Sequence, residues 1–337
     1  VIGGGRFQAD TADVQVNGEL RLRGAGTENS LANLPTEGGY DVEAWYPAAT
    51  LIYDFSDSLN ARIAYSKTLA LPSPREVSPF ATNTFGANDI EIGNPLLQPS
   101  DVENFDIGSN FVSDAGDSVG VTLFHKKVAG RIERLNGLNI DTDAAMITTN
   151  ETLGAALYSW YNNPSESTIT GIELEGRKEL AFLDLGGPFD CMSVGGNYAY
   201  IDGQVDRFPI EVERKENIGI SVDESRPLTE QPEHILNLDL TYDNPERGLK
   251  ISLIYYYISD TLKAVSLDTG YDIYSEGYSA LDMTLSQEFW DRYKLSVALK
   301  NLTNPKRGNY YDVEGRKFEA DSERKGRVFS ISLSGEF

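Results

Sequence analysis

The C-terminal stretch of the chain alternates between apolar and polar residues. Apolar side chains occupy Phe329, Ile331, Leu333 and Phe337, and serine stands at each even position from 330 to 334. Successive side chains of a strand point to opposite faces, so this stretch predicts a strand with one apolar and one wet face. Small serines are typical of the wall of a wet lumen. The alternative at this point is a half-buried edge strand of a soluble sandwich.

Eleven earlier stretches carry strand patterns of the same kind, and none has helical periodicity with caps. Tight turns are expected near Ser56, Ala115, Gly187, Pro245 and Asp291. Long loops are expected at about 8–40, 69–99, 135–155, 203–232, 260–276 and 303–324. The predicted strands are 1–7, 43–55, 59–67, 102–112, 119–134, 156–182, 191–201, 234–242, 249–258, 279–288, 293–301 and 325–337.

The connections between these strands alternate strictly between short and long. A transmembrane barrel has short turns on one side and long loops on the other, whereas Greek-key sandwiches have no such strict alternation. The sequence therefore predicts an all-β fold: an antiparallel, up-and-down transmembrane β-barrel with about 12 strands.

Composition is compatible with this fold and excludes several others. The mean hydropathy of −0.35 is that of a soluble protein, yet half of every barrel strand faces water, so a barrel has the same average. The greasiest stretch, Leu253 to Ile258, is far shorter than a membrane helix. A net charge of −23 disfavours nucleic-acid binding, and the single Cys191 excludes an internal disulfide framework. The chain begins at Val1 without a leader pattern, which suggests a fragment.

Several groups of residues resemble, in family order, the barrel of TonB-dependent outer-membrane receptors. They are 64–68 (AYSKT) with 72–76 (PSPRE), 93–99 (GNPLLQP), 102–108 (VENFDIG), 123–127 (LFHKK), 161–163 (YNN) before 171–174 (GIEL), 300–305 (KNLTNP) and the closing 326–337. Each is weak alone, since Asn-Pro is a general turn initiator, but together they span nearly the whole chain.

The resemblance implies a plugged barrel of about 22 strands, of which residues 1–337 would be the C-terminal portion. The plug, the TonB-binding segment and the early strands are not in this sequence. The implied function is TonB-energised uptake of a scarce bulky solute across the bacterial outer membrane: a ferric siderophore first, an oligosaccharide or cobalamin otherwise. The implied partners are outer-membrane lipid, the extracellular solute, TonB-ExbB-ExbD through the plug, and the barrel-assembly machinery through Phe337. A passive porin, an adhesin or a structural barrel is the alternative.

Catalytic and metal chemistry have little support in the sequence. A hydrolase would need an imidazole beside a nucleophile, and the two histidines, His125 and His234, are better read as structural or lumen-facing. No cofactor is expected, and no zinc spacing occurs. Acidic loop residues at Asp141, Asp143, Asp223 and Glu224 suit Ca²⁺, although a solvated loop is the better reading. The protein is expected not to be an enzyme.

Ligand contact is expected from loop aromatics and lumen-facing cations. Each tyrosine has an alternative role in an interfacial aromatic belt. The basic residues fall on the polar faces of their strands. The candidates are Phe80, Asn83, Phe85, Tyr158, Trp160, Tyr161, Tyr271, Tyr274, Tyr310, Tyr311, Arg62, Lys294 and Lys300.

The terminal aromatic also suggests an orientation. If the assembly machinery reads Phe337, as the resemblance implies, the last strand ends at the periplasmic side. The short turns are then periplasmic and the long loops extracellular.

Overall fold

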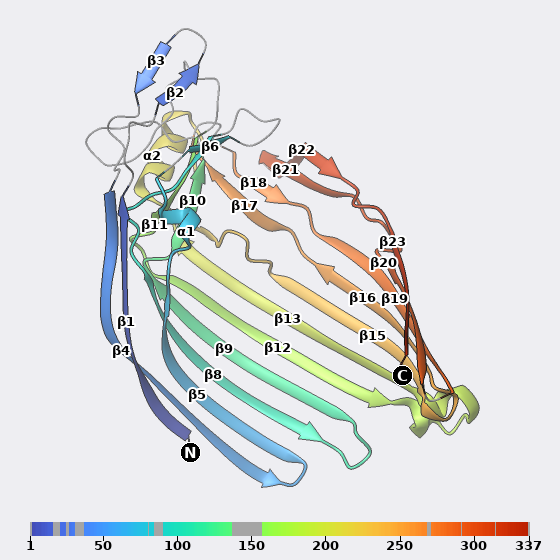
Figure 1. The fold of residues 1–337 in the computed structure, drawn as a ribbon. Coiled ribbons are helices and arrows are strands. Elements are labelled where there is room, and N and C mark those ends of the chain that lie inside the picture. The colour runs from blue at the N-terminus through green and yellow to red at the C-terminus, as the bar shows by residue number, and fades with distance from the viewer. Residues whose placement is uncertain are drawn as a thin grey trace.

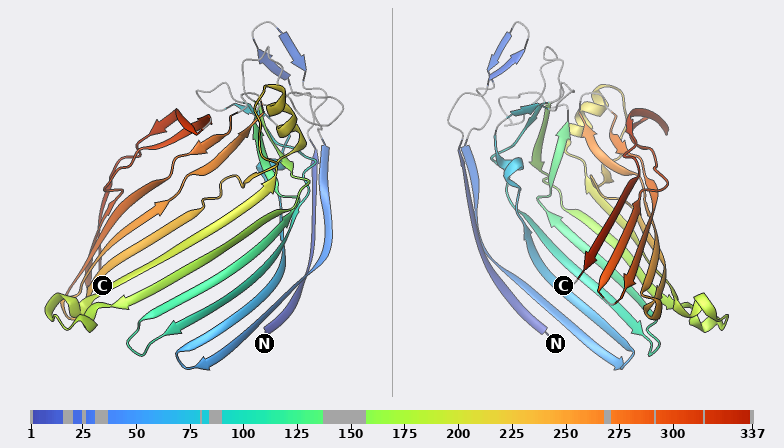
Figure 2. Two further views of the ribbon diagram at one scale, coloured as in Figure 1. Left: turned by 180° about the vertical axis from the view of Figure 1, so that it is seen from behind. Right: turned by 45° about the vertical axis from the view of Figure 1, so that its right-hand side comes forward.

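Twelve long antiparallel strands follow one another in sequence order and form a curved wall (Figures 1 and 2). The computed structural model describes residues 2–15, 21–24, 27–30, 37–79, 81–83, 90–136, 157–267, 271–290, 292–313 and 315–335. The wall strands are β1 (Ile2–Gln15), β4 (Glu37–Ser56), β5 (Leu59–Ala70), β8 (Ser100–Val112), β9 (Ser118–Ala129), β12 (Ser167–Glu179), β13 (Met192–Asp206), β15 (His234–Asn244), β16 (Leu249–Ile258), β19 (Tyr278–Phe289), β20 (Tyr293–Lys300) and β23 (Val328–Gly335). Within the described residues the wall ends at β1 and β23, so it is an open part of a barrel. The predicted up-and-down strand order is confirmed.

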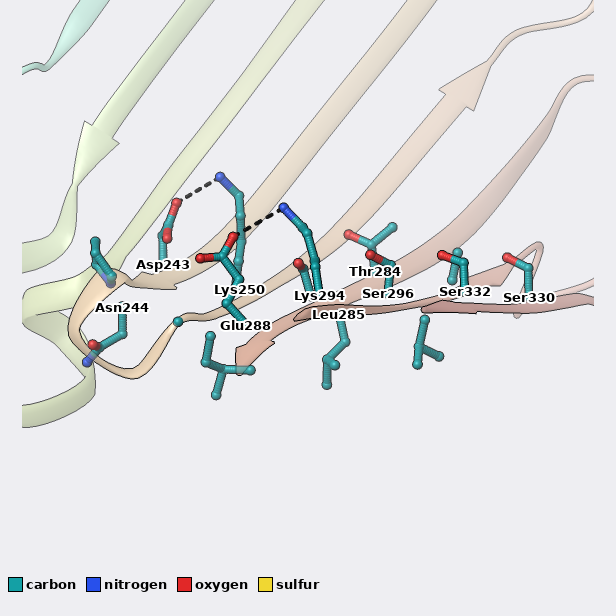
Figure 3. Close-up of a pocket in the computed structure, with 16 residues that line it drawn as sticks. Asp243, Asn244, Lys250, Thr284, Leu285, Glu288, Lys294, Ser296, Ser330 and Ser332 are labelled. Carbon is teal, nitrogen blue, oxygen red and sulfur yellow. Dashed lines mark hydrogen bonds and ion pairs between the residues drawn. The ribbon is translucent and has the colours of Figure 1, made fainter. Parts of the chain in front are cut away.

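The two faces of the wall differ in chemistry as the alternation predicts. In the β20–β23 ladder Ser296 lies opposite Ser332, and Val297 lies opposite Ile331. The serines and Thr284 point to one side of the strands in Figure 3, and Leu285 points to the other. The apolar face is open to its surroundings: Ile331 is 63% exposed and Leu333 is 71% exposed. An apolar surface this extended is stable against lipid rather than water.

Short connections gather at one end of the wall, which we call the turn end. Asp57 and Ser58 join β4 to β5, residues 113–117 join β8 to β9, and η3 (Pro245–Arg247) joins β15 to β16. Gly116 and Gly248 close two of these turns with φ values of +87° and +58°, which residues with a side chain rarely adopt. The β12–β13 connection is longer, with η1 (Leu180–Leu183) and η2 (Gly187–Cys191). The turn predicted at Asp291 falls on a residue outside the described ranges.

The opposite, loop end carries a second sheet of eight short strands, the loop-end sheet. Two of its ladders are parallel, β10 with β17 and β11 with β7, and they join segments far apart in the sequence. Its order is β22 (Arg316–Glu323), β21 (Arg307–Val313), β18 (Ile273–Ser275), β17 (Thr261–Ser266), β10 (Ile132–Asn136), β11 (Leu157–Asn162), β7 (Ile90–Ile92) and β6 (Ala81–Asn83). The remaining elements here are β2 (Arg21–Gly24), β3 (Thr27–Ser30), β14 (Ser225–Pro227), α1 (Pro74–Val77) and α2 (Pro209–Asn217).

The dry core of the described chain lies at the loop end rather than in the wall. Ile92, Leu135, Leu228 and Val265 are fully buried there. A single curved sheet has no second layer to cover it, whereas the loop-end sheet packs against its own connections. None of the helices in the described ranges is long and apolar enough to span a bilayer.

Four details differ from the sequence-based expectation. The run 119–134 is divided into β9 and β10 at Gly130, whose φ is +66°. The run 156–182 is likewise divided into β11 and β12. Helix α2 was not predicted, because its sequence is almost wholly polar and its fixing contacts are with residues distant in the chain. The first long loop is also shorter than expected, since β1 continues to Gln15 and β4 begins at Glu37.

Candidate ligand-binding site at the loop end

Two arginines converge on one glutamate at the loop end. Arg75 lies in helix α1, where Ser73 caps the first turn: the Ser73 N–H donates to the Glu76 carboxylate at 2.6 Å. From there Arg75 Nε and Nη2 donate to Glu91 Oε1 at 3.1 and 2.9 Å. Arg134, in β10, donates from Nη2 to Glu91 Oε2 at 2.8 Å. Each carboxylate oxygen thus has its own guanidinium, and the three groups carry a net charge of about +1.

Two aromatic rings flank these guanidinium groups. The Arg134 guanidinium carbon lies 4.1 Å from the centre of the Tyr158 ring, and that of Arg75 lies 5.7 Å from the Trp160 ring. Both are within cation–π range. The β10–β11 register places Arg134 opposite Trp160, and Asn94 Nδ2 donates to the Trp160 carbonyl at 2.9 Å. We call these five residues, Arg75, Glu91, Arg134, Tyr158 and Trp160, the arginine–aromatic cluster.

The arginine–aromatic cluster is partly open to solvent. The side chains of Arg75 and Arg134 are 33% and 34% exposed, and that of Glu91 is 24% exposed. Among the described residues none hydrogen-bonds to Arg134 Nε. A partly desolvated pair of planar cations beside aromatic rings suits an anionic, aromatic solute.

A second cluster surrounds Asp260, which directly precedes β17, and its other members come from β18, β21 and β22. Tyr310 donates its hydroxyl to Asp260 Oδ2 at 2.7 Å, and Lys317 Nζ lies 2.5 Å from the same oxygen. The Tyr274 and Tyr310 rings stack with centres 5.5 Å apart. Burial and the hydrogen bond to Asp260 raise the pKa of Tyr310 to about 12. Burial works against the carboxylate of Asp260, but the hydrogen bonds from Lys317, the Gly277 N–H and Tyr310, together with the charge of Lys317, outweigh burial and lower the pKa of Asp260.

The raised pKa of Tyr310 predicts a loss of stability in strong base. An unfolded tyrosine ionises near pH 10, so between pH 10 and about 12 the unfolded chain has released a proton that the folded chain keeps. The contribution of Tyr310 is complete below pH 10 and is lost as the pH rises through about 12. To measure this pKa, the tyrosinate absorbance is titrated against pH in the wild type and in Tyr310→Phe, and the difference between the two curves gives the titration of Tyr310. A midpoint near 10 would contradict the hydrogen bond to Asp260.

A third cluster, the Arg226 cluster, is buried beneath α2 and holds the loop end together. Arg226 lies on β14 and donates to Glu211 Oε1 of α2 at 2.9 Å and to Glu133 Oε2 of β10 at 2.9 Å. All three side chains are fully buried. Burial opposes the charged form, but hydrogen bonds with Glu211 and the nearby Glu133 carboxylate raise the pKa of Arg226. Lys215 continues the cluster, with Nζ 2.7 Å from Asp272 Oδ1.

The predicted site residues fall into separate groups. Tyr158 and Trp160 belong to the arginine–aromatic cluster, and Tyr274 and Tyr310 stack 5.5 Å apart in the Asp260 cluster. Tyr161 pairs with Glu133 across β10–β11, and Tyr311 pairs with Ile273. Tyr271 is half-buried close to Asp272 in the chain, Asn83 ends β6, and Phe80 and Phe85 lie outside the described residues.

The three predicted lumen cations follow the polar face of the wall. Arg62 Nη2 lies 3.4 Å from the Thr122 hydroxyl, and Lys294 Nζ lies 3.5 Å from Glu288. Lys300 shares the face of Lys294 on β20, because their positions differ by an even number. Figure 3 shows Lys294 beside a second ion pair, Lys250 with Asp243 at 2.8 Å.

The histidines considered for catalysis and the acidic residues considered for calcium binding have hydrogen-bond partners within the protein where the structure describes them. His125 Nδ1 hydrogen-bonds with the Thr170 hydroxyl, and His234 Nδ1 with that of Tyr198, each at 2.8 Å. Asp223 and Glu224 offer their carbonyls to Arg207, while Asp141 and Asp143 lie outside the described residues. Across the described chain no group of three or more His, Cys, Asp or Glu is placed to hold a metal ion.

The charged partners of the aromatic candidates were not predicted from the sequence. Arg75 belongs to a quoted motif (72–76), but its pairing with Glu91 joins an α1 residue to a β7 residue without a local pattern. Arg134 and Arg226 have partners 43 and 93 positions away. One signal was available: basic residues are scarce in a chain of net charge −23, so an arginine next to loop aromatics is unusual.

A curved antiparallel wall with an apolar outer face, a polar inner face and elaborated loops at one end is the architecture of an outer-membrane β-barrel. Residues 1–302 match the family model described as "TonB dependent receptor-like, beta-barrel". The chain therefore belongs to the family of TonB-dependent receptor β-barrels, which are transport proteins rather than enzymes and lie in the outer membrane of Gram-negative bacteria.

Solved structures show the same fold at low sequence identity. The copper transporter OprC is 15% identical with a TM-score of 0.62, over 99% of this chain and 45% of its own. The ferric-catecholate import receptor Fiu from K12 E. coli is 15% identical with a TM-score of 0.57, over 99% and 42%. The ferric enterobactin receptor PfeA of Pseudomonas aeruginosa, as the Q482A mutant in complex with enterobactin, is 16% identical with a TM-score of 0.56, over 89% and 42%. The chain thus spans less than half the length of these structures. No curated protein matches the sequence.

The orientation of the wall predicts where a protease cuts intact cells. Residues 218–224 follow α2 at the loop end as coil, and Ile218 is 53% exposed. With the loop end outside the cell, a broad-specificity protease is expected to cut in 218–224 and to spare the turn at Gly187 until the outer membrane is permeabilised. Mass spectrometry of the fragments locates the cuts. Cleavage at Gly187 in intact cells, with 218–224 protected, would invert the orientation.

Proposed function

We propose that the complete receptor takes up a ferric siderophore with aromatic, anionic chelating groups across the outer membrane, using energy delivered through TonB. The single observation that carries this proposal is the arginine–aromatic cluster. It places two partly exposed guanidinium groups beside two aromatic rings, of which Tyr158 is buried, on the loop end of a strongly acidic protein. A ferric catecholate combines negative charge with aromatic faces, so it matches both features at once.

In this proposal the wall and the loop end have different tasks. The loop end selects the solute, because the net positive charge of the arginine–aromatic cluster concentrates an anion against the general repulsion of a chain with a net charge of −23. The polar face of the wall then offers serine and threonine hydroxyls and paired charges, such as Lys294 with Glu288, along the path of passage. In the complete receptor, the energy-coupling partners would act through segments outside residues 1–337. Two of the similar structures are a ferric-catecholate and a ferric enterobactin receptor, which supports the choice of solute class.

The first test is growth. A strain lacking the receptor is supplied with ferric catecholate, ferric hydroxamate, cobalamin, copper or oligosaccharide sources in turn. The proposal is supported if growth on the ferric catecholate alone is lost without the receptor and is restored when the receptor gene is returned. Dependence on a neutral oligosaccharide or on cobalamin would refute the assigned solute class while leaving the family membership intact.

The second test is direct binding of ferric enterobactin to the purified receptor. Arg134→Gln removes a guanidinium that sits 4.1 Å from Tyr158, and we expect the dissociation constant to rise. A charge-assisted contact is worth about 1.5–3 kcal/mol, which corresponds to a rise of about 10- to 100-fold. The control is Arg316→Gln, an exposed arginine on β22, which is expected to leave binding unchanged. Equal effects from the two substitutions would exclude the arginine–aromatic cluster as the capture site.

A further inference from the structure

The apolar face of the wall has a groove at a position where glycines of two neighbouring strands lie side by side. Gly176 of β12 and Gly196 of β13 lie directly opposite each other. They share the apolar face with Leu174 and Val194, because each glycine is two residues from one of them. A Cβ added at Gly176 would meet no atom closer than 3.4 Å, so the space above Gly176 is open. A Cβ at Gly196 would lie 2.7 Å from Leu238 Cδ2, so the Leu238 side chain covers Gly196 and forms one wall of the groove. The resulting groove has a volume of about 580 Å³, and Val119 and Leu238 line it with these residues.

A charged pair stands at the turn end of this groove. Lys178 of β12 lies in register with Val194, on the apolar face, and its ammonium group pairs with Asp117. Asp117 is fixed by a second bond, since its Oδ1 accepts the Glu179 N–H at 3.0 Å. Lys178 Nζ also lies 4.7 Å from the centre of the Phe182 ring. The Lys178 side chain remains 46% exposed, so a further anionic partner can approach it from outside the wall.

The connection next to the groove is itself apolar and exposed. Between β12 and β13 the chain forms η1 and η2 and projects from the turn end (Figure 2). Phe182 is 61% exposed, Leu183 42% and Leu185 62%. The turns at 57–58 and 113–117 are tighter and contain only Asp, Ser, Ala and Gly. The β19–β20 turn also exposes an aromatic residue, Trp290, at 84%. Exposed aromatic and aliphatic side chains next to a lysine at a barrel rim are typical of a membrane interface.

We propose that this groove binds one glycerophospholipid of the periplasmic leaflet, with an acyl chain over Gly176 and against Leu238 and its phosphate at Lys178. The four residue steps along β12 from Lys178 to Leu174 span about 13 Å, which lets an extended acyl chain follow the groove from the headgroup level into the bilayer. Because Gly176 has no side chain, the acyl chain makes more van der Waals contact in the groove than it would on a smooth barrel surface. Asp117 beside Lys178 is complementary to the ammonium group of a zwitterionic headgroup. The proposal rests on the outer-membrane position and orientation of the wall and is independent of the solute.

Native mass spectrometry of the receptor, purified from outer membranes in a mild detergent, tests the site. We expect one phospholipid to stay bound to the wild type under conditions that remove bulk lipid. Gly176→Leu fills the groove, and displacing two methylene groups of the acyl chain lowers affinity by about tenfold. The matched control is Ala61→Leu, which adds bulk to the apolar face of β5 away from the groove and should leave occupancy unchanged. The ratio of lipid-bound to lipid-free receptor is the readout.

A second variant tests the headgroup and keeps the proposal decidable if Gly176→Leu does not fold. Lys178→Gln is expected to lower phospholipid occupancy about tenfold, as for the loss of one charge-assisted contact. Its control is Lys250→Gln, which breaks a similar exposed ion pair on the polar face. Folding is checked for each variant by its migration in an unheated gel. Any one of three results would overturn the site: no discrete lipid on the wild type, equal occupancy in the folded variants and controls, or a lipopolysaccharide in place of a phospholipid.

Discussion

Replacing Arg226 with methionine is expected to loosen the loop end by about 3 kcal/mol, the lower end of the usual range for a broken buried ion pair. Methionine keeps most of the side-chain volume but leaves Glu133 and Glu211 buried without their shared cation. The loss is at the lower end because each carboxylate keeps another partner. Asn163 Nδ2 donates to Glu133 at 3.0 Å, and Arg207 lies 3.2 Å from Glu211.

Hydrogen exchange of the amides of α2 measures this effect locally. A loss of about 3 kcal/mol raises the fraction of open α2 by about 100-fold, and the amides exchange faster in the same proportion. The control is Arg177→Met on the polar face, whose guanidinium lies 3.6 Å from Asp239 and is 42% exposed. Exposed pairs of this kind are worth about 0–1 kcal/mol. If both variants exchanged like the wild type, the Arg226 cluster would have no part in fixing α2.

Replacing Ile331 with arginine is expected to destabilise the folded barrel by about 2–4 kcal/mol if the residue lies near the bilayer midplane. Ile331 sits on the apolar face, opposite Val297 and 63% exposed, so the new charge would enter hydrocarbon. Denaturant unfolding of the receptor folded into phospholipid vesicles gives the free energy of unfolding for each variant.

Ser332→Arg is the matched control, since it introduces the same side chain one residue along the same strand. Ser332 faces Ser296 on the polar face, where a guanidinium keeps its water, so we expect a much smaller loss. A larger loss at Ser332 than at Ile331 would mean that the serine face meets lipid, and the inside and outside of the wall would have to be exchanged.

The wall could be predicted from the sequence because its rule is local. The face on which a residue such as Leu333 lies follows from the residues two positions away, and this period of two can be recognised in a short stretch of sequence. The loop end has no such rule. Leu135 and Val265 pair in a parallel ladder, and Arg226 meets Glu133, so the partners of these residues are fixed by tertiary contacts that no short window contains.

The candidate site was predictable only in part: its aromatic residues could be identified from the sequence, and its charged residues could not. Aromatic residues crowd the segment 158–161, which identified Tyr158 and Trp160 without further information. The cations that lie against those rings come from α1 and β10, and the carboxylate that fixes both comes from β7. Which aromatic residue gains a charged neighbour is therefore decided by the fold, since Tyr274 and Tyr310 stack on each other instead.

The parallel ladders of the loop-end sheet have a consequence for the order of folding. β10 and β17 meet through Leu135 and Val265, whose positions differ by 130, and the wall strands from β12 to β16 lie between them in the chain. Contacts between residues so far apart in sequence are unfavourable early in folding, because closing the loop lowers the conformational entropy of the whole intervening segment. Once the wall has formed, it holds the two ends at the same rim and most of that entropy is already lost. The wall should therefore assemble before the loop-end sheet, so that the receptor acquires its recognition surface as the last step of maturation.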